Sequence, residues 1–176
     1  MKKWVIILTI IISVIVVFLL VLFLKVVIFQ KGIIGIVQVE PYIKDEVNRL
    51  FNEDPSRKVA VVPDSGLIII PGGEDGSFYF SIKNVGDSES KFRYYIQVSD
   101  PERLKYCNIE KNEAESWISV TSGSMILSEG EMNEVPEYIT FLIPPGTPPC
   151  IVKYELKINE DGIEYIDIPL NVKITA

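Results

Sequence analysis

The sequence predicts an antiparallel β-sandwich of about seven to nine strands, preceded by one transmembrane helix and a short amphipathic helix. Three observations indicate this organisation. An uncharged apolar run occupies residues 4–24, helically spaced apolar residues follow at 41–52, and a two-residue alternation begins near residue 58. The expected domains are a transmembrane signal anchor at 1–29, a neck at 30–57 and a sandwich domain at 58–176.

The apolar run, WVIILTIIISVIVVFLLVLFL, contains 21 residues and no charge. A bilayer core needs about 20 apolar residues, so we expect this segment to span the membrane in contact with lipid. A cleaved signal peptide is the first alternative, but no small-residue cleavage motif follows Leu24. A buried core helix is the second. Lys2 and Lys3 predict a cytoplasmic N-terminus and an extracytoplasmic C-terminal domain at the cell membrane.

The neck contains a segment, PYIKDEVNRLFN at 41–52, whose apolar residues fall on one helical face. These residues are Ile43, Val47, Leu50 and Phe51. We therefore expect a short amphipathic helix. Three positions remain open for its apolar face, namely against the sandwich, on the membrane surface or against a partner.

The body alternates apolar and polar residues, as strands with one buried face do. Turn clusters rich in Gly, Pro, Asn and Asp separate the runs. The expected strands lie at 58–62, 67–70, 78–83, 92–98, 117–120, 125–128, 138–143, 151–158 and 163–174. An antiparallel sandwich fits this regular spacing, and a β-barrel is the alternative.

Several of these segments resemble a known group of domains. The segments are GSFYFSIKN at 76–84, SWISVTSG at 116–123, LSEGE at 127–131 and IPPGTPPCIVKYELKI at 143–158. Over residues 66–175 the chain resembles Ig-like modules of archaeal and bacterial cell-surface proteins, including the BACON-type and major-sperm-protein-like groups. The resemblance implies an Ig-like sandwich used for adhesion, spacing or assembly, with Trp117 buried between the sheets. Cys150 stands where these modules usually have glycine.

The residue content argues against catalysis. The chain has no histidine and two cysteines, Cys107 and Cys150, which fall short of the four ligands of a structural zinc site. We therefore expect no metal, no cofactor, no catalytic residue and no enzymatic activity. In an extracytoplasmic body the two cysteines indicate a disulfide, with two free thiols as the alternative.

The charge of the chain is unevenly distributed. Residues 1–35 hold four lysines and no acid, whereas the remaining 13 basic and 24 acidic residues give the body a net charge of −11. Such a body lacks the basic surface that a phosphate backbone requires, so nucleic-acid binding is not expected.

One group of residues forms a local exception. Tyr79 and Tyr95 fall on the outward register of two strands, together with Lys83 and Arg93. If those two strands pair, the four residues share one solvent-facing surface. Aromatic residues and arginine dominate many binding sites, so this face is the candidate partner-binding site, with cross-strand stabilisation of the sheet as the competing role.

The sequence thus favours a membrane-anchored binding or structural subunit of a cell-surface assembly. The expected partners are other cell-surface or membrane proteins, or a polysaccharide. Two other roles remain open. The chain could be a subunit of an archaeal surface filament or motor stator, or an accessory subunit of a membrane enzyme complex.

Overall fold

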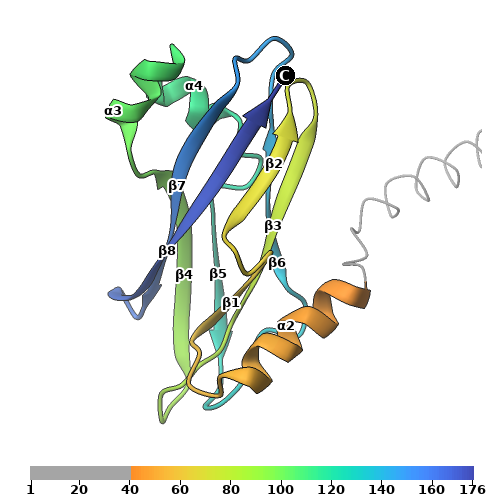
Figure 1. Cartoon of the computed structure of the whole chain (residues 1–176). Coiled ribbons are helices and arrows are strands. Elements are labelled where there is room, and N and C mark those ends of the chain that lie inside the picture. The colour runs from red at the N-terminus through yellow and green to blue at the C-terminus, as the bar shows by residue number, and fades with distance from the viewer. Residues whose placement is uncertain (1–40) are drawn as a thin grey trace, which may run out of the picture. The chain divides into compact units, whose positions relative to one another are not determined.

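The computed structural model describes residues 41–176, and its elements carry the labels of Figure 1. The predicted span at 4–24 and the first part of the neck lie outside this range. Between residues 41 and 176, no helix has the length and apolar character needed to cross a bilayer. The elements are α2 (Pro41–Glu53), β1 (Val59–Val62), β2 (Leu67–Pro71), β3 (Asp75–Ile82), β4 (Ser90–Val98), α3 (Pro101–Leu104), η1 (Lys105–Cys107), α4 (Lys111–Ser116), β5 (Ser122–Leu127), β6 (Glu137–Leu142), β7 (Cys150–Glu160) and β8 (Ile163–Thr175).

The strands form two sheets, as the alternation predicts. One sheet has three strands in the order β1-β3-β6, and the other has five in the order β2-β8-β7-β4-β5. The first two strands of the chain lie in different sheets: β1 is at the edge of the three-stranded sheet and β2 at the edge of the five-stranded sheet (Figure 1). One expectation is wrong in part, because β2 runs parallel to β8, with Leu67 opposite Asn171. The remaining strand pairs of these two sheets are antiparallel.

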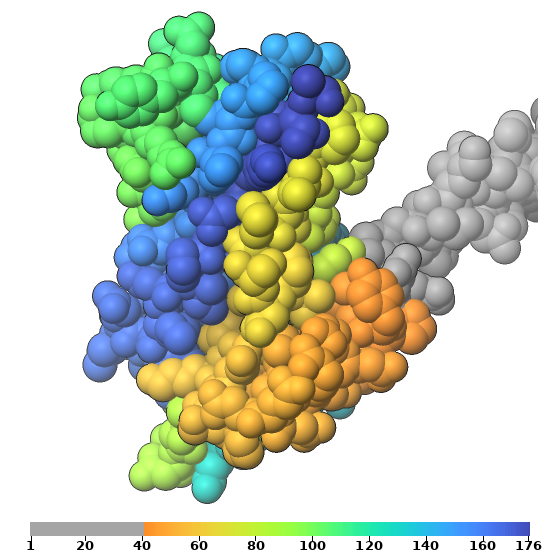
Figure 2. All heavy atoms as spheres, in the orientation of Figure 1, coloured from red at the N-terminus to blue at the C-terminus, as the bar shows by residue number. Residues whose placement is uncertain are grey.

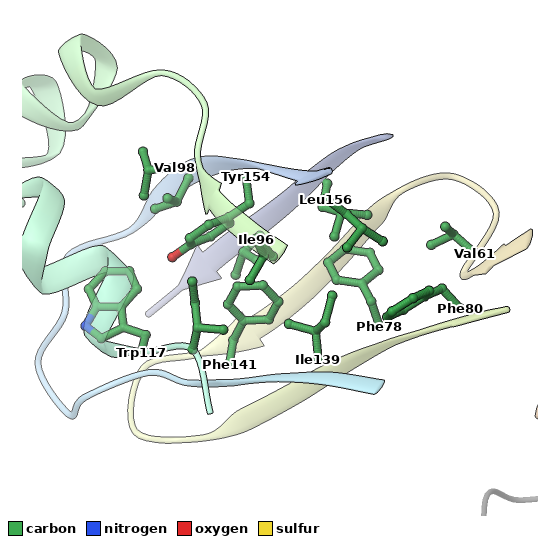
Figure 3. Close-up of a cluster of buried hydrophobic side chains, with 14 of the residues drawn as sticks. Val61, Phe78, Phe80, Ile96, Val98, Trp117, Ile139, Phe141, Tyr154 and Leu156 are labelled. Carbon is green, nitrogen blue, oxygen red and sulfur yellow. The ribbon is translucent and has the colours of Figure 1, made fainter. Parts of the chain in front are cut away.

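The inward side chains of both sheets make the main core (Figure 3). Strand β4 shows the alternation clearly, since its even-numbered residues are buried while Lys91, Arg93 and Tyr95 are exposed. Aromatic rings fill the centre, where the centroids of Phe141 and Tyr154 lie 4.7 Å apart. The largest buried side chains include Trp117, Tyr154, Phe78, Phe80, Phe92 and Phe141.

A short helical segment between β4 and β5 was not predicted from the alternation. It contains α3, η1 and α4, each six residues or shorter. Asp100 caps α3 by accepting a hydrogen bond from the backbone N–H of Arg103 at 3.2 Å. The Trp117 ring is buried as expected, but Trp117 ends α4 instead of opening a strand. The predicted strand at 117–120 is reduced to a single bridge between Ile118 and Phe141.

Helix α2 confirms the amphipathic segment and packs against the sandwich. Its four buried residues meet the outward side chains of β1, Ala60 and Val62, with Tyr79 and Met132 at the margin. These contacts form a second apolar cluster, separate from the main core. By its contacts α2 belongs to the compact unit Val39–Ala176. Of the three positions left open for its apolar face, the structure has the one against the body.

Candidate functional site

The two sheets present different outer faces. Helix α2 covers β1 and part of β3 on the outer face of the three-stranded sheet, through the second apolar cluster. The outer face of the five-stranded sheet instead carries exposed or half-exposed polar side chains on β4, β5, β7 and β8, and the exposed apolar residues Leu67 and Ile69 on β2. On its central strand β4, Arg93 is exposed and 38 % of the Tyr95 surface is accessible. This uncovered surface, called here the basic face, is the candidate functional site.

The structure separates the four residues predicted to form one partner-binding face. Strand β3 pairs with β1 and β6, whereas β4 pairs with β5 and β7, so the two strands that carry the tyrosines are not neighbours. Arg93 and Tyr95 lie together on the basic face. Tyr79 packs beside α2, 6.4 Å from the ring of Tyr138, and the Nζ of Lys83 donates to the carbonyl of Pro55 at 3.2 Å.

The predicted shared face is therefore wrong in its geometry. The connection from β3 to β4 crosses from one sheet to the other, and alternation along each strand gives no information on which strands pair. The outward residues of β3 lie on the side of the sandwich where α2 packs, whereas the outward residues of β4 lie on the basic face.

Sequence reasoning missed the cations that β7 and β8 add to Arg93. In the register of these strands, Lys157 lies opposite Tyr95 and Asn159 opposite Arg93. The outward cations of the basic face are Lys91, Arg93, Lys153, Lys157 and Lys173. Its outward carboxylates are Glu155, Glu164 and Asp167. The outward positions of 151–174 carried this signal, but it becomes visible only once the register of β7 and β8 is known.

The basic face opposes the charge of the rest of the body. Its five cations and three carboxylates give a net charge of +2. Residues 41–176 hold 13 basic residues and 23 acidic ones, since Glu40 precedes them, and the net charge is −10. The remainder of the described body therefore carries −12. Such a separation of charge attracts an anionic partner to this face and repels it elsewhere.

Within the described residues, the ion pairs of the basic face all involve Lys157. The ammonium of Lys157 lies 3.2 Å from a carboxylate oxygen of Glu155 and 2.5 Å from one of Asp167. The Asp167 hydrogen bond, followed by the one to Glu155, raises the pKa of Lys157. Among the described residues, Lys91, Arg93, Lys153 and Lys173 form no ion pair. These four cations are available to a ligand.

A disulfide lies at one end of the basic face. Cys107 and Cys150 are bonded, with their Cα atoms 5.8 Å apart, which confirms the predicted bridge. It joins the end of η1 to the first residue of β7. Beside it lies an open pocket of about 530 Å³. The lining residues are Asp100, Glu102, Arg103, Tyr106, Cys107, Cys150 and Ile151.

The pocket continues the basic face. Ile151 lines the pocket and also lies on the outer side of β7, two residues before Lys153. The helical segment stands out as a separate green lobe beside the blue atoms of β7 (Figure 2). Tyr106 on this lobe is 91 % exposed. No group of three potential metal-ligating side chains occurs within residues 41–176. The polar and aromatic groups of the face and the pocket are cations, carboxylates, amides and exposed rings.

Comparisons with known proteins give structural likeness only. No protein-family model matches the chain, and no curated protein is significantly similar to it. Similar solved structures include PapD-like domain 7 of human CEP192, with 17 % identity, a TM-score of 0.38, and coverage of 69 % of this chain and 87 % of that one. Another is SSP-19, an MSP-domain protein like family member in Caenorhabditis elegans, with 13 % identity, a TM-score of 0.36, and coverage of 64 % and 97 %.

A third similar structure is the periplasmic chaperone SfaE. It shares 14 % identity and a TM-score of 0.36, and the match covers 66 % of this chain and 55 % of that one. At these values the likeness carries no inference about what this chain binds.

Proposed function

We propose that the chain is a single-pass, membrane-anchored Ig-like module that acts as a binding or structural subunit of a cell-surface assembly. Its sandwich lies outside the cytoplasm, it has no catalytic activity, and it engages its partner through the basic face. The apolar run at 4–24 supports the membrane anchor. The four unpaired cations of an otherwise acidic body support the binding role, and this observation carries the proposal.

The physical argument rests on what a purely structural sheet requires. An antiparallel sheet with one solvated face needs polar outward residues, but they need not share one sign of charge. Like charges on neighbouring positions repel one another and add nothing to the stability of the sheet. Concentrating unpaired cations on one face therefore adds nothing to the stability of the sheet, whereas an anionic partner can pair with them.

The topology of the chain is tested on intact cells that express the full protein. Protease added from outside is expected to digest the sandwich, because Lys2 and Lys3 hold the N-terminus in the cytoplasm. Protection in intact cells with digestion only after lysis would contradict the extracytoplasmic location.

The binding role is tested by crosslinking tagged full-length protein in its native cells. Replacing Arg93 with Gln and Tyr95 with Ser is expected to abolish the crosslinked product while the melting temperature stays nearly unchanged, because both side chains are exposed. The matched control replaces Lys44 with Gln and Tyr42 with Ser, which likewise removes one cation and one exposed ring, here from the surface of α2. An unchanged crosslinked product in the first variant, or equal loss in both, would refute a role of the basic face.

A further inference from the structure

The basic face is long and leads into the pocket. From Asn159, opposite Arg93, to Ile151 at the pocket, β7 runs eight residues, which is about 26 Å at about 3.3 Å per residue. Neighbouring outward positions along the strand are thus about 7 Å apart. A surface of this length that ends in a concave site fits an extended polymer whose end enters the pocket.

The side chains along this path offer three kinds of contact. Arg93 and Lys153 on the face supply cations for carboxylate or sulfate groups. In the pocket, Arg103 lies beside the acidic residues Asp100 and Glu102, so the cations that attract an anion are those of the face. The exposed rings of Tyr95, opposite Lys157 on the face, and of Tyr106, at the pocket, supply apolar surfaces. Amide side chains that can bond hydroxyl groups lie between them at Gln97 and Asn171, and a third, Asn159, lies beyond Tyr95.

The distribution of apolar residues argues against a protein partner on this path. Protein interfaces have an apolar centre and a polar rim. Here two strongly exposed aliphatic residues of the sheet, Ile69 on β2 and Ile126 on β5, lie on its two edge strands. The centre contains the ion pairs of Lys157 with Glu155 and Asp167, and one aromatic ring, Tyr95, opposite Lys157. A hydrated, hydroxyl-rich ligand matches such a centre.

We infer that the basic face and the pocket beside the disulfide together bind an acidic polysaccharide, with Tyr95 and Tyr106 each contacting a sugar ring. Cations select the acidic groups, and the rings select sugar over a charged polymer without rings. This inference rests on the proposed function and names the class of ligand for the same surface.

The test measures binding of the full chain, purified in a neutral detergent, to polygalacturonate. The matched neutral probe is the same polymer after methyl esterification, which keeps the sugar rings and removes their charge. Poly-glutamate provides charge without sugar rings, and anionic lipid vesicles provide a charged membrane surface. We expect binding to polygalacturonate that disappears on esterification and in about 1 M salt, where the screening length is about 3 Å.

Single substitutions divide the site into its parts. Arg93→Gln and Lys153→Gln are expected to weaken binding about threefold to fivefold each, as loss of one exposed ion pair does. Tyr95→Ser and Tyr106→Ser are expected to weaken it at least fivefold, because aromatic contacts at a binding site cost more when truncated. Tyr42→Ser and Lys44→Gln serve as controls on α2 and are expected to leave binding unchanged.

Three results would overturn the inference. Equal affinity for poly-glutamate with no effect of Tyr95→Ser would indicate attraction by charge alone. Binding only to anionic vesicles would assign the face to a membrane surface. Failure to bind any probe, while the crosslinked partner in cells still depends on Arg93 and Tyr95, would exclude the polysaccharide and leave the proposed function standing.

Discussion

Tyr154 and Tyr95 lie on opposite sides of the same sheet, and their hydroxyl groups have different surroundings. The Tyr154 ring is fully buried, and its hydroxyl donates to the carbonyl of Ala114 within α4, 2.9 Å away. This bond joins the helical segment to the core of the sandwich. Burial raises the pKa of Tyr154, so the protonated donor form persists in the folded chain.

Replacing Tyr154 with Phe is expected to lower the free energy of unfolding by about 1–3 kcal/mol, because the Ala114 carbonyl loses a buried partner. Urea denaturation of the full chain in detergent measures the difference. Tyr95→Phe is the control, since its hydroxyl is on the exposed face, and its effect is expected to stay within about 0.5 kcal/mol. Equal effects in the two variants would show that the buried hydrogen bond does not stabilise the fold.

Tyr94 makes stability depend on alkaline pH. Burial, and next its 2.9 Å hydrogen bond to the carboxylate of Glu137, raise its pKa above the ordinary value of 10.0. A raised folded-state pKa contributes stability that is fully present below the unfolded pKa and is lost as pH rises through the folded value. The melting temperature is therefore expected to be level up to about pH 10 and to fall above it.

Thermal unfolding at a series of pH values from neutral to strongly alkaline measures this dependence. Tyr94→Phe removes one of the contributing hydroxyls and should make the decline shallower. A decline that begins well below pH 10, or one that Tyr94→Phe leaves unaltered, would assign the alkaline dependence to other groups.

At the scale of elements, α2 is held by its own apolar cluster, so it can open without the core opening. Leu50 is completely buried at the centre of that cluster. Leu50→Ala removes a buried side chain, which typically costs about 2–5 kcal/mol. We expect amide hydrogen exchange to accelerate throughout Pro41–Glu53, while exchange in β4 and β7 stays slow.

Lys44→Gln, on the exposed side of α2, is the control and should leave exchange in the helix unchanged. Faster exchange across both sheets in Leu50→Ala would mean that α2 and the sandwich unfold as one unit.

The elements also show what could be predicted from the sequence. Helix α2 and most strands were predictable, because their period of apolar residues is local and their inward positions are buried. The parallel pairing of β2 with β8 was not, since it joins residues about 100 positions apart along the chain. The short helices at 101–116 escaped because no run is long enough to show a helical period, although Asp100 before Pro101 was a usable start signal.

The candidate site, like the fold, could be predicted from the sequence only in part. Outward register correctly placed Arg93 and Tyr95 on a solvent-exposed face. The assignment of Tyr79 and Lys83 to the same face failed because pairing between strands is set by the packing of both sheets. The cations of β7 and β8 joined the site for the same non-local reason. The alternation along a strand therefore does not reveal which other strands lie beside it in the sheet.

At the scale of the whole molecule, α2 belongs to the folded unit although it precedes the first strand. A fragment of residues 58–176 would expose the apolar surface of Ala60, Val62, Tyr79 and Met132 to water. We expect residues 39–176 to give a monomeric protein with one cooperative thermal transition, and residues 58–176 to aggregate or melt at a lower temperature.

Size-exclusion chromatography and circular dichroism of the two fragments compare these outcomes. Adding Leu50→Asp to the longer fragment should make it behave like the shorter one, because a buried charge undocks α2. Identical stability and solubility of both fragments would show that the second apolar cluster is dispensable.

Because β1 and β2 belong to different sheets, a mechanical force on the chain acts on the two sheets one after the other. Tension applied to the chain ahead of α2 reaches the sandwich through α2 and then β1, which is bonded to β3, before it reaches β2. Because β2 lies parallel to β8, a pull on the N-terminal end of β2 against the C-terminal end of β8 loads all their hydrogen bonds at once in shear instead of opening them one after another. Under load we therefore expect α2 to detach first, while the pairing of β2 with β8 holds the five-stranded sheet and its basic face together.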